Sequence, residues 1–130
     1  NSKAKGELSE AVILCRALRR GFSVSVPFGN NQRYDLILDD GKQLLKAQCK
    51  TGRVVNGAVE FATCSANGFT FKKTSYRDQI DVFLVYCPET EQVYRVPARI
   101  VGKTSMRLRI SKPRSVKPTG IITCASRFIF

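Results

Sequence analysis

The longest uninterrupted apolar run of the chain, VFLVYC at residues 82–87, is the feature that most constrains its fold. This run is far shorter than the roughly 20 apolar residues that cross a membrane, so we expect no transmembrane helix. Continuous apolar strands of this kind lie in the middle of a sheet that is covered on both faces. The run therefore predicts a central, buried strand.

Residues 5–20 have the pattern of an amphipathic helix. Their apolar side chains recur at three- and four-residue spacing and form one stripe: Leu8, Ala11, Val12, Cys15 and Leu18. Glu7 would lie in the first turn, and Arg19 and Arg20 in the last, where their charges favour the helix dipole. Gly21 follows as the C-cap residue. This segment predicts one N-terminal helix that packs through the apolar stripe.

Short strands separated by turn residues follow this helix. We expect strands at residues 22–26, 33–38, 42–50, 54–55, 58–61, 82–87, 93–96 and 106–110, and loops at residues 63–76 and 111–120. Asp40-Gly41 and Asn56-Gly57 are tight-turn sequences that predict two antiparallel hairpins. One helix, a hairpin-rich sheet and no internal repeat predict a single α/β or α+β domain over residues 1–130.

Basic residues outnumber acidic ones and gather toward the C-terminal end. The chain holds 22 Lys and Arg against 10 Asp and Glu, a net charge of +12, and no acidic residue follows Glu91. This balance indicates a polyanionic partner, most often a nucleic acid. Ribosomal and membrane-surface proteins share the balance, so the charge predicts a class of partner and no activity.

The chain has no histidine, which removes several classes of enzyme. A Ser-His-Asp triad, a Cys-His dyad, a His-ligated zinc ion and a histidine general base are all excluded. Any enzyme built on this chain works with carboxylates, Lys, Tyr, Ser or Cys.

The cysteines are odd in number and include no C-x-x-C pair, which argues against a disulfide framework or a four-cysteine zinc site. They are expected to be small core residues in a reducing compartment: Cys15, Cys49, Cys64, Cys87 and Cys124. The sequence does not open with a basic stretch followed by an apolar one, so no signal peptide is expected. We expect a protein of the cytoplasm, an organellar matrix or a nucleoid, not a secreted one.

Asp35 stands in the sequence YDLIL, where an acidic residue interrupts an expected strand. Asp is disfavoured in strands, and a buried polar group needs a partner or a purpose. With a two-residue turn in this hairpin, Asp35 faces Lys46 on the next strand. Lys46, Gln48 and Lys50 then share one face of the hairpin with Asp35, an arrangement that a slip of one residue would undo.

An acidic side chain of the expected helix completes a set of oxygen donors. Glu10 borders the apolar stripe and could reach over the edge of the sheet. Glu10, Asp35 and Gln48 together supply the oxygen ligands that Mg²⁺ prefers, with Lys50 beside them. Such an ion would polarise a phosphate and lower the pKa of bound water, while Lys50 positions the attacking water. The alternative is a surface hairpin in which Asp35 forms an ion pair with Lys46 or Lys50.

These residues in this order resemble the PD-(D/E)XK nuclease superfamily. Its pattern is a helix with an acidic residue, an Asp on one strand and (D/E)-x-K on the next, here KGELSEAVILCRALRRGF, RYDLILDDGKQLL and AQCKTG. PFG-x-N-x-RYDL followed by Q-x-KTG is similar to a small group of endonucleases encoded within group I introns, which cut intron-lacking alleles and promote intron homing. The resemblance covers about residues 5–97, and no motif covers the basic region 98–130.

The resemblance implies a fold and a role for each residue of the motif. Asp35 would be the central metal ligand, Lys50 the catalytic lysine, and Glu10 the helix acid with Glu7 as a substitute. Gln48 stands where most members have Asp or Glu, and its neutral carbonyl oxygen should hold a metal more weakly. The implied fold is a restriction-endonuclease-like α+β core, with a central mixed sheet and an N-terminal helix. The implied cofactor is Mg²⁺, for which Mn²⁺ can substitute.

The resemblance also implies double-stranded DNA, and no membrane, as the partner. Site-specific members of this size act as homodimers or homotetramers, because one small domain cuts one strand. Basic side chains would then divide between phosphate contacts and guanine recognition. The candidates for DNA contact are Arg33, Arg53, Lys72, Lys73, Arg77, Arg107 and Arg109.

Three functions are open on this basis. The leading one is a Mg²⁺-dependent, site-specific double-strand DNA endonuclease of the homing type, that is, a metal-dependent deoxyribonuclease. The second is a structure-selective nuclease of the Holliday-junction resolvase type. The third is a catalytically inactive DNA-binding module on the same fold. Gln48 favours this third function, which predicts salt-sensitive binding without cutting.

Overall fold

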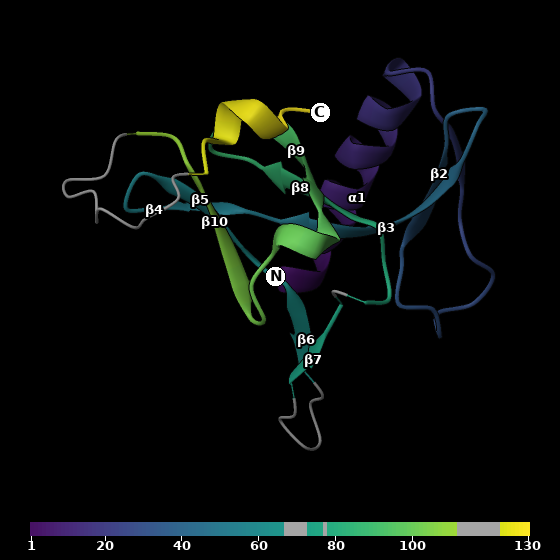
Figure 1. Ribbon diagram of the computed structural model, residues 1–130, viewed down its shortest axis with the longest axis horizontal. Coiled ribbons are helices and arrows are strands. Elements are labelled where there is room, and N and C mark those ends of the chain that lie inside the picture. Colours follow the sequence, from purple (N-terminus) through teal and green to yellow (C-terminus); the bar gives the residue numbers. More distant parts are fainter. Residues whose placement is uncertain (67–72, 77, 112–122) are drawn as a thin grey trace.

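The structure of the protein is a computed structural model that describes residues 1–66, 73–76, 78–111 and 123–130. One N-terminal helix precedes a series of short strands (Figure 1). In chain order, with η marking a 3-10 helix, the elements are α1 (Ser2–Arg19), β1 (Ser23–Ser25), β2 (Leu36–Asp39), β3 (Leu44–Thr51), β4 (Arg53–Val55), β5 (Ala58–Ala62), β6 (Cys64–Ala66), β7 (Lys73–Ser75), β8 (Val82–Cys87), β9 (Gln92–Pro97), η1 (Ala98–Ile100), β10 (Ser105–Arg109) and η2 (Ala125–Phe128).

A mixed five-stranded sheet in the order β1-β2-β3-β8-β9 forms the centre of the fold. β8 pairs parallel with β3 and antiparallel with β9, and all of its side chains except that of Tyr86 are buried. The apolar run 82–87 is therefore a buried strand between two others, as predicted, and β9 is an edge strand. The expected α+β fold, with a central mixed sheet and an N-terminal helix, is confirmed.

Different elements cover the two faces of this sheet. Helix α1 packs on one face through Ile13, which lies in one hydrophobic cluster with Leu38 and Leu84. A smaller sheet, in the order β10-β5-β4, packs on the other face through Val59, which lies in a second cluster with Phe83. Side chains alternate along a strand, so neighbouring residues of β8 serve opposite clusters. This double burial explains why the run is apolar throughout.

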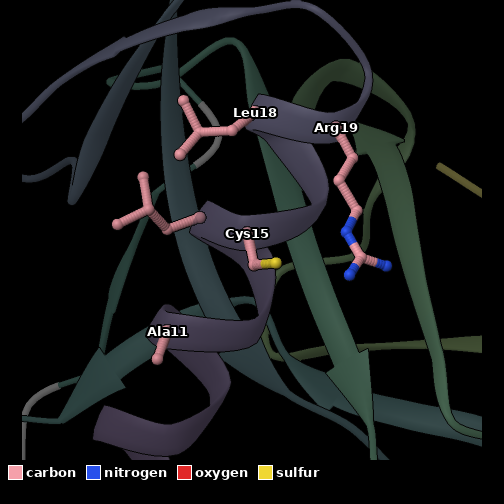
Figure 2. A pocket seen from close by; sticks show the side chains of 5 residues that line it. Ala11, Cys15, Leu18 and Arg19 are labelled. Carbon is pink, nitrogen blue, oxygen red and sulfur yellow. The ribbon is translucent and has the colours of Figure 1, made fainter.

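Helix α1 turns a different side to the sheet than the one predicted. Its buried residues are Ser9, Ile13 and Ala17. Leu8 and Leu18, which belong to the predicted stripe, are 57% and 55% exposed. Figure 2 shows the outward side of the helix, which also carries Ala11 and Cys15. Residues 11–15 are apolar without interruption, so their spacing alone does not fix which side is buried.

The helix also begins earlier than predicted. The Asn1 side chain accepts a hydrogen bond from the main-chain N–H of Lys3 (3.0 Å) and caps a helix that starts at Ser2. Glu7 therefore lies beyond the first turn, contrary to the prediction. Gly21, which was predicted to end the helix, follows it with a left-handed φ of 86°.

The hairpin of β2 and β3 has a wider turn than predicted. Asp39 pairs with Leu44 and not with Lys42, so the register is shifted by two residues along β3. The Asp40 carboxylate accepts hydrogen bonds from the main-chain N–H groups of Lys42 and Gln43, both at 2.8 Å, which stabilises a loop over residues 40–43. Because side chains alternate, a shift of two preserves which residues of a strand share a face.

The other predicted strands are present with shifted ends, and two unpredicted ones occur. The hairpin of β4 and β5 turns through Asn56 and Gly57 at positive φ values of 49° and 74°, as its sequence predicted. Residues 33–35 precede β2 instead of belonging to it. β6 and β7 pair antiparallel within residues 63–76, where a loop was predicted. The predicted loop 111–120 lies outside the described residues except for its first residue.

The region after residue 97 contributes to the interior. Leu108 and Ala125 are buried, and β10 pairs with β5. The main-chain N–H of Phe130 donates to the carbonyl oxygen of Val93 (2.8 Å), and its main-chain oxygen accepts from the Arg16 guanidinium (2.7 Å). The last described residues are therefore tied to both β9 and α1.

Two cysteines, Cys49 and Cys87, are buried as predicted, whereas Cys15 is exposed and Cys64 and Cys124 are partly exposed. All of them are free thiols. In the described part of the chain, no helix is both long enough and apolar enough to span a membrane.

Candidate active site

Asp35 lies where the loop after β1 joins β2, and the main chain of β3 holds it in place. Its N–H donates to the carbonyl oxygen of Ala47 (2.9 Å), and its Oδ2 accepts the N–H of Cys49 (3.0 Å). The register of β2 and β3, continued by one residue, places Asp35 opposite Gln48 instead of the predicted Lys46. The corrected register brings the two polar residues of the motif closer together than the predicted one.

Lys50 lies two residues further along β3, on the face that α1 does not cover. Its ammonium group is 4.7 Å from the centre of the Tyr76 ring, in a cation–π contact. Burial lowers the pKa of Lys50, and the negative charge of Asp35 partly opposes this change. Lys50 is therefore a cation held in a poorly solvated place within the field of Asp35.

The negative charge of Asp35 acts on Glu10, the second carboxylate of the predicted site. Burial raises the pKa of Asp35, and the N–H of Cys49 and the charge of Lys50 partly oppose the change. The pKa of Glu10, the more exposed of the two acids, is raised first by burial and then by the charges of Asp35 and Glu7. A cation between Glu10 and Asp35 would favour the ionised form of both.

A cavity of about 220 Å³ opens beside these acids. Glu10 and Asp35 form part of its wall, and the loop between β1 and β2 forms the rest: Val26, Pro27, Gly29, Asn30, Gln32 and Tyr34. Because a water molecule in the liquid occupies about 30 Å³, the cavity has room for several waters or for a phosphate group.

The alternative interpretation of this hairpin, a surface ion pair, does not describe the structure. Among the described residues, the ion pairs both involve Glu60, and none joins Asp35 to Lys46 or Lys50. The main-chain N–H of Lys46 donates to the Asp81 carboxylate instead (2.8 Å). Within the part of the chain that the structure describes, the Asp35 carboxylate thus accepts from one main-chain donor and keeps acceptor positions for a ligand.

The donors of this site fit a weakly held Mg²⁺. Within the described ranges, no cluster of three or more His, Cys, Asp or Glu side chains could hold a metal ion, so a tightly bound metal is not expected. Glu10 and Asp35 offer carboxylate oxygens, and Gln48 offers a neutral amide oxygen. Mg²⁺ is commonly bound by one or two carboxylates, with waters and substrate phosphates completing its shell. Glu10 and Asp35, which line one cavity, are therefore the carboxylates that could hold the ion, and the strand register sets Gln48 opposite Asp35.

Arg33, predicted as a DNA contact, is engaged inside the protein. Its guanidinium lies 3.8 Å from the centre of the Tyr76 ring. It also donates to the Ser65 hydroxyl (2.7 Å) and to the side-chain oxygen of Gln79. The pKa of Lys50 is lowered mainly by burial, and to a smaller extent by the charge of Arg33. The buried Tyr76 ring thus contacts two cations, one of which is the lysine of the motif.

Three other predicted DNA contacts lie on one face of the small sheet. Arg53 on β4 and Arg107 on β10 both pair across strands with Glu60 on β5, with N–O distances of 3.5 and 2.8 Å. The hydrogen bond from Arg107 lowers the pKa of Glu60, which therefore stays ionised. Arg109 follows two residues after Arg107, and its Nε donates to the main-chain oxygen of Ser111 (3.3 Å). We call Arg53, Arg107 and Arg109 the basic face.

The remaining predicted DNA contacts cannot be placed. Lys72 and Arg77 lie outside the described residues, and of Lys73 only the main chain in β7 is described. Tyr76, in contrast, lies beside Arg33 and Lys50, two contacts that the sequence did not predict. Its contacts with Arg33 and Lys50 join distant parts of the chain, and no local spacing signals such contacts.

Comparison with known proteins supplies a family and a fold. A family model described as PD-(D/E)XK endonuclease matches residues 1–129. Among solved structures, the chain is similar to a bacterial homing endonuclease, I-Ssp6803I, with a TM-score of 0.76 and 24% sequence identity. This similarity covers 99% of the present chain and 88% of that chain. No curated protein matches the chain at a significant level.

Proposed function

Since the chain belongs to the PD-(D/E)XK endonuclease family and is a nuclease, we propose that it is a Mg²⁺-dependent, site-specific endonuclease that cuts both strands of DNA. The observation that carries the proposal is the joint placement of Asp35 and Lys50 on one hairpin, as poorly solvated groups of opposite charge. Glu10 adds a second carboxylate, which shares with Asp35 the wall of a cavity that Gln48 and Lys50 do not line. Such a set of groups can bind a cation and a phosphate together.

Each residue of the motif has its own task in this proposal. Asp35, fixed by the Cys49 N–H, and Glu10 would give carboxylate oxygens to the ion, and Gln48 would give a neutral oxygen. Lys50 donates hydrogen bonds that orient the attacking water, and its charge offsets that of the phosphate. When bound, Mg²⁺ lowers the pKa of water and stabilises charge on the leaving oxygen.

Gln48 gives the site one potential negative charge fewer than Asp or Glu would give at the same position. We therefore propose that Mg²⁺ binds tightly only together with DNA, whose phosphate supplies further oxygen ligands. The same residue is the feature that favours an inactive DNA-binding module, which the experiment below distinguishes.

The proposed biological role is that of a homing endonuclease. A bacterial protein described as a homing endonuclease shares the fold over 99% of this chain, and the motif PFG-x-N-x-RYDL points the same way. In this proposal the basic face of the small sheet contacts DNA phosphates, since two of its arginines have side chains that are 73% and 53% exposed.

Cutting both strands requires more than one site, because one site of this kind hydrolyses one phosphodiester bond. We propose a homodimer or homotetramer, in which two sites face the two strands of a near-palindromic sequence. Light scattering with and without DNA measures the mass. A monomer on DNA that still makes paired breaks would contradict this part of the proposal.

The proposal is tested with a diverse pool of long duplex DNA, spiked with four-way junctions, in Mg²⁺. Wild type and Asp35→Asn are incubated with the pool, and the new ends are sequenced. Recurrent breaks at one motif, made only by wild type, support a site-specific nuclease. Breaks at junctions in any flanking sequence would indicate the resolvase type. DNA retained by both proteins without breaks would indicate the binding module.

A further inference from the structure

The loop between β1 and β2 carries an aromatic side chain that the fold does not use. Phe28 has a relative exposure of 106%, and Val26 in the same loop is 69% exposed. Phe61 and Phe83, by contrast, are buried in the cluster between the two sheets. Exposure of this degree means that Phe28 packs against no apolar group in the described part of the chain.

The same loop forms part of the wall of the candidate active site. Pro27 and Gly29 line the cavity together with Glu10 and Asp35, whereas Phe28, which stands between them, does not. Gly29 has a φ of 80°, and no atom lies within 4 Å of the place that a Cβ would take. The backbone thus turns at the outer rim of the cavity and leaves the Phe28 ring in solvent.

The loop presents no negative charge to a polyanion. Residues 26–33 include no Asp or Glu, and their polar side chains are amides and one guanidinium: Asn30, Asn31, Gln32 and Arg33. Amides can donate to and accept from base edges, so the residues beside Phe28 are chemically suited to a DNA groove. The acids that would repel DNA face the cavity, where a cation would neutralise them.

We propose that Phe28 is an aromatic wedge that stacks on DNA bases beside the phosphodiester group held at Glu10 and Asp35. This inference rests on the proposed nuclease function. Because the loop and the two acids border one cavity, DNA whose phosphate reaches Asp35 brings its neighbouring bases to the rim of the loop. Aromatic rings stack on any base, and apolar wedges unstack base steps in proteins that bend DNA.

The wedge positions the phosphate to be cut and selects the base step beside it. Opening a base step bends the duplex and seats the neighbouring phosphate over the acids. Pyrimidine–purine steps unstack most easily, so a wedge selects them without reading a base edge. We therefore expect the cut to lie next to such a step.

A fluorescence experiment tests the wedge directly. The chain has no tryptophan, so Phe28→Trp creates a single reporter in the loop. Leu44→Trp is the matched control, because Leu44 is 65% exposed and pairs with Asp39 at the end of β2 that lies away from the loop. Both are made in the Asp35→Asn background, which keeps the DNA uncut. They are titrated with an end-labelled duplex of mixed sequence and with a duplex carrying the mapped cut site.

Anisotropy of the label reports DNA binding, and tryptophan emission reports stacking. The inference predicts quenching on binding, with protection from iodide, in the Phe28→Trp protein but not in the Leu44→Trp protein. Unchanged emission while the label reports binding would overturn the wedge and leave the nuclease proposal intact. No binding in any variant would overturn both. Quenching that follows protein concentration without DNA would show a contact between copies and would also overturn the wedge.

Cleavage rates give a second, independent readout. Because the ring is fully exposed, neither Phe28→Ala nor Phe28→Tyr should change Tm. Phe28→Ala should slow single-turnover cleavage by about ten- to a hundredfold, and Phe28→Tyr, which keeps a stacking ring, should stay within about threefold of wild type. Equal rates for Phe28→Ala and wild type would contradict the inference.

Discussion

Two regions of the molecule offer charge to DNA in opposite ways. At the candidate active site, Asp35 and Lys50 are half-buried. Burial raises the pKa of Asp35 and lowers the pKa of Lys50, which favours the neutral form of each. On the basic face, Arg53 and Arg107 are exposed and form surface ion pairs with Glu60. The first region holds few charges in fixed places, and the second spreads its charges in water.

This difference sets how much one substitution can change. In a poorly solvated place, each charge interacts strongly with its neighbours, so the loss of one group disables the site. In water, salt screens each charge and neighbouring cations substitute for one another. We therefore expect large, salt-independent effects on cleavage from the first region and small, salt-dependent effects on binding from the second.

Apart from Asp35→Asn, the largest effect is expected from Lys50→Met, which removes the ammonium group but keeps a side chain of similar length against the Tyr76 ring. Single-turnover cleavage should fall about a hundred- to a thousandfold, because the charge offered to the phosphate is lost. The Kd for DNA, measured by anisotropy, should change little. A loss of affinity as large as the loss of rate would place Lys50 with the binding residues and break the comparison.

Asp35→Asn should change stability in the direction opposite to its effect on activity. Burial raises the pKa of Asp35 in the folded state, so the protonated form favours folding below the ordinary pKa, and this stability is lost as the pH rises through the raised value. At neutral pH the ionised carboxylate therefore lowers stability. Asparagine can still accept the Cys49 N–H, and Asp35→Asn should raise Tm at neutral pH without divalent ions.

The difference in Tm should disappear in two conditions. At about pH 3, where the wild-type Asp35 carboxyl is protonated, the two proteins should have the same Tm. At neutral pH, Mg²⁺ at a concentration that fills the weak DNA-free site near Glu10 and Asp35 should raise the Tm of wild type only. Thermal scans in these conditions measure both changes. A wild type that is the more stable protein at neutral pH without metal would show that desolvation does not dominate at Asp35.

Arg33 tests whether a predicted DNA contact acts with the candidate active site or with the basic face. Its contacts with Tyr76, Ser65 and Gln79 place it with the buried region, where it supports Lys50. Arg33→Gln should then slow cleavage by roughly tenfold, as loss of a supporting group does, with the salt dependence of Kd unchanged. A slope of log Kd against log salt that falls by about one would mark Arg33 as a phosphate contact, as the sequence predicted.

The smallest effects are expected on the basic face. Arg107→Ala should weaken DNA binding by less than about tenfold and reduce the salt slope by about one, with no change in cleavage at saturating DNA. Glu60→Gln is its counterpart, because it removes the acid that both arginines face and should tighten binding at low salt. Anisotropy titrations over a salt series measure both variants. Weaker binding by Glu60→Gln would mean that this acid holds the arginines in place for DNA.

Features set by local chemistry could be predicted from the sequence. Asn56 and Gly57 marked a hairpin because its turn requires left-handed backbone at both positions. The register of β2 and β3 was predicted with an error of two residues, because the Asp40 side chain stabilises a wider loop. Since the error was even, the face of β3 that carries Gln48 and Lys50 was still predicted.

Features set by packing between distant segments could not be predicted. The apolar residues 11–15 point to all sides of helix α1. Packing against the sheet therefore determines that Ile13 and Ala17 are buried while Leu18 is exposed. Tyr76 meets Arg33 and Lys50 from another part of the chain, in a segment that was expected to be a loop. Neither the buried side of the helix nor the contacts of Tyr76 can be predicted from the local spacing of residues.

In this proposal, Asp35 serves the cutting of DNA and not its binding. The most direct test measures both properties on one duplex that carries the mapped cut site, in Mg²⁺, with wild type and Asp35→Asn from matched preparations. We expect the same Kd for both proteins within a few fold, and no detectable cleavage by Asp35→Asn. Cleavage by Asp35→Asn at a rate near that of wild type would contradict it.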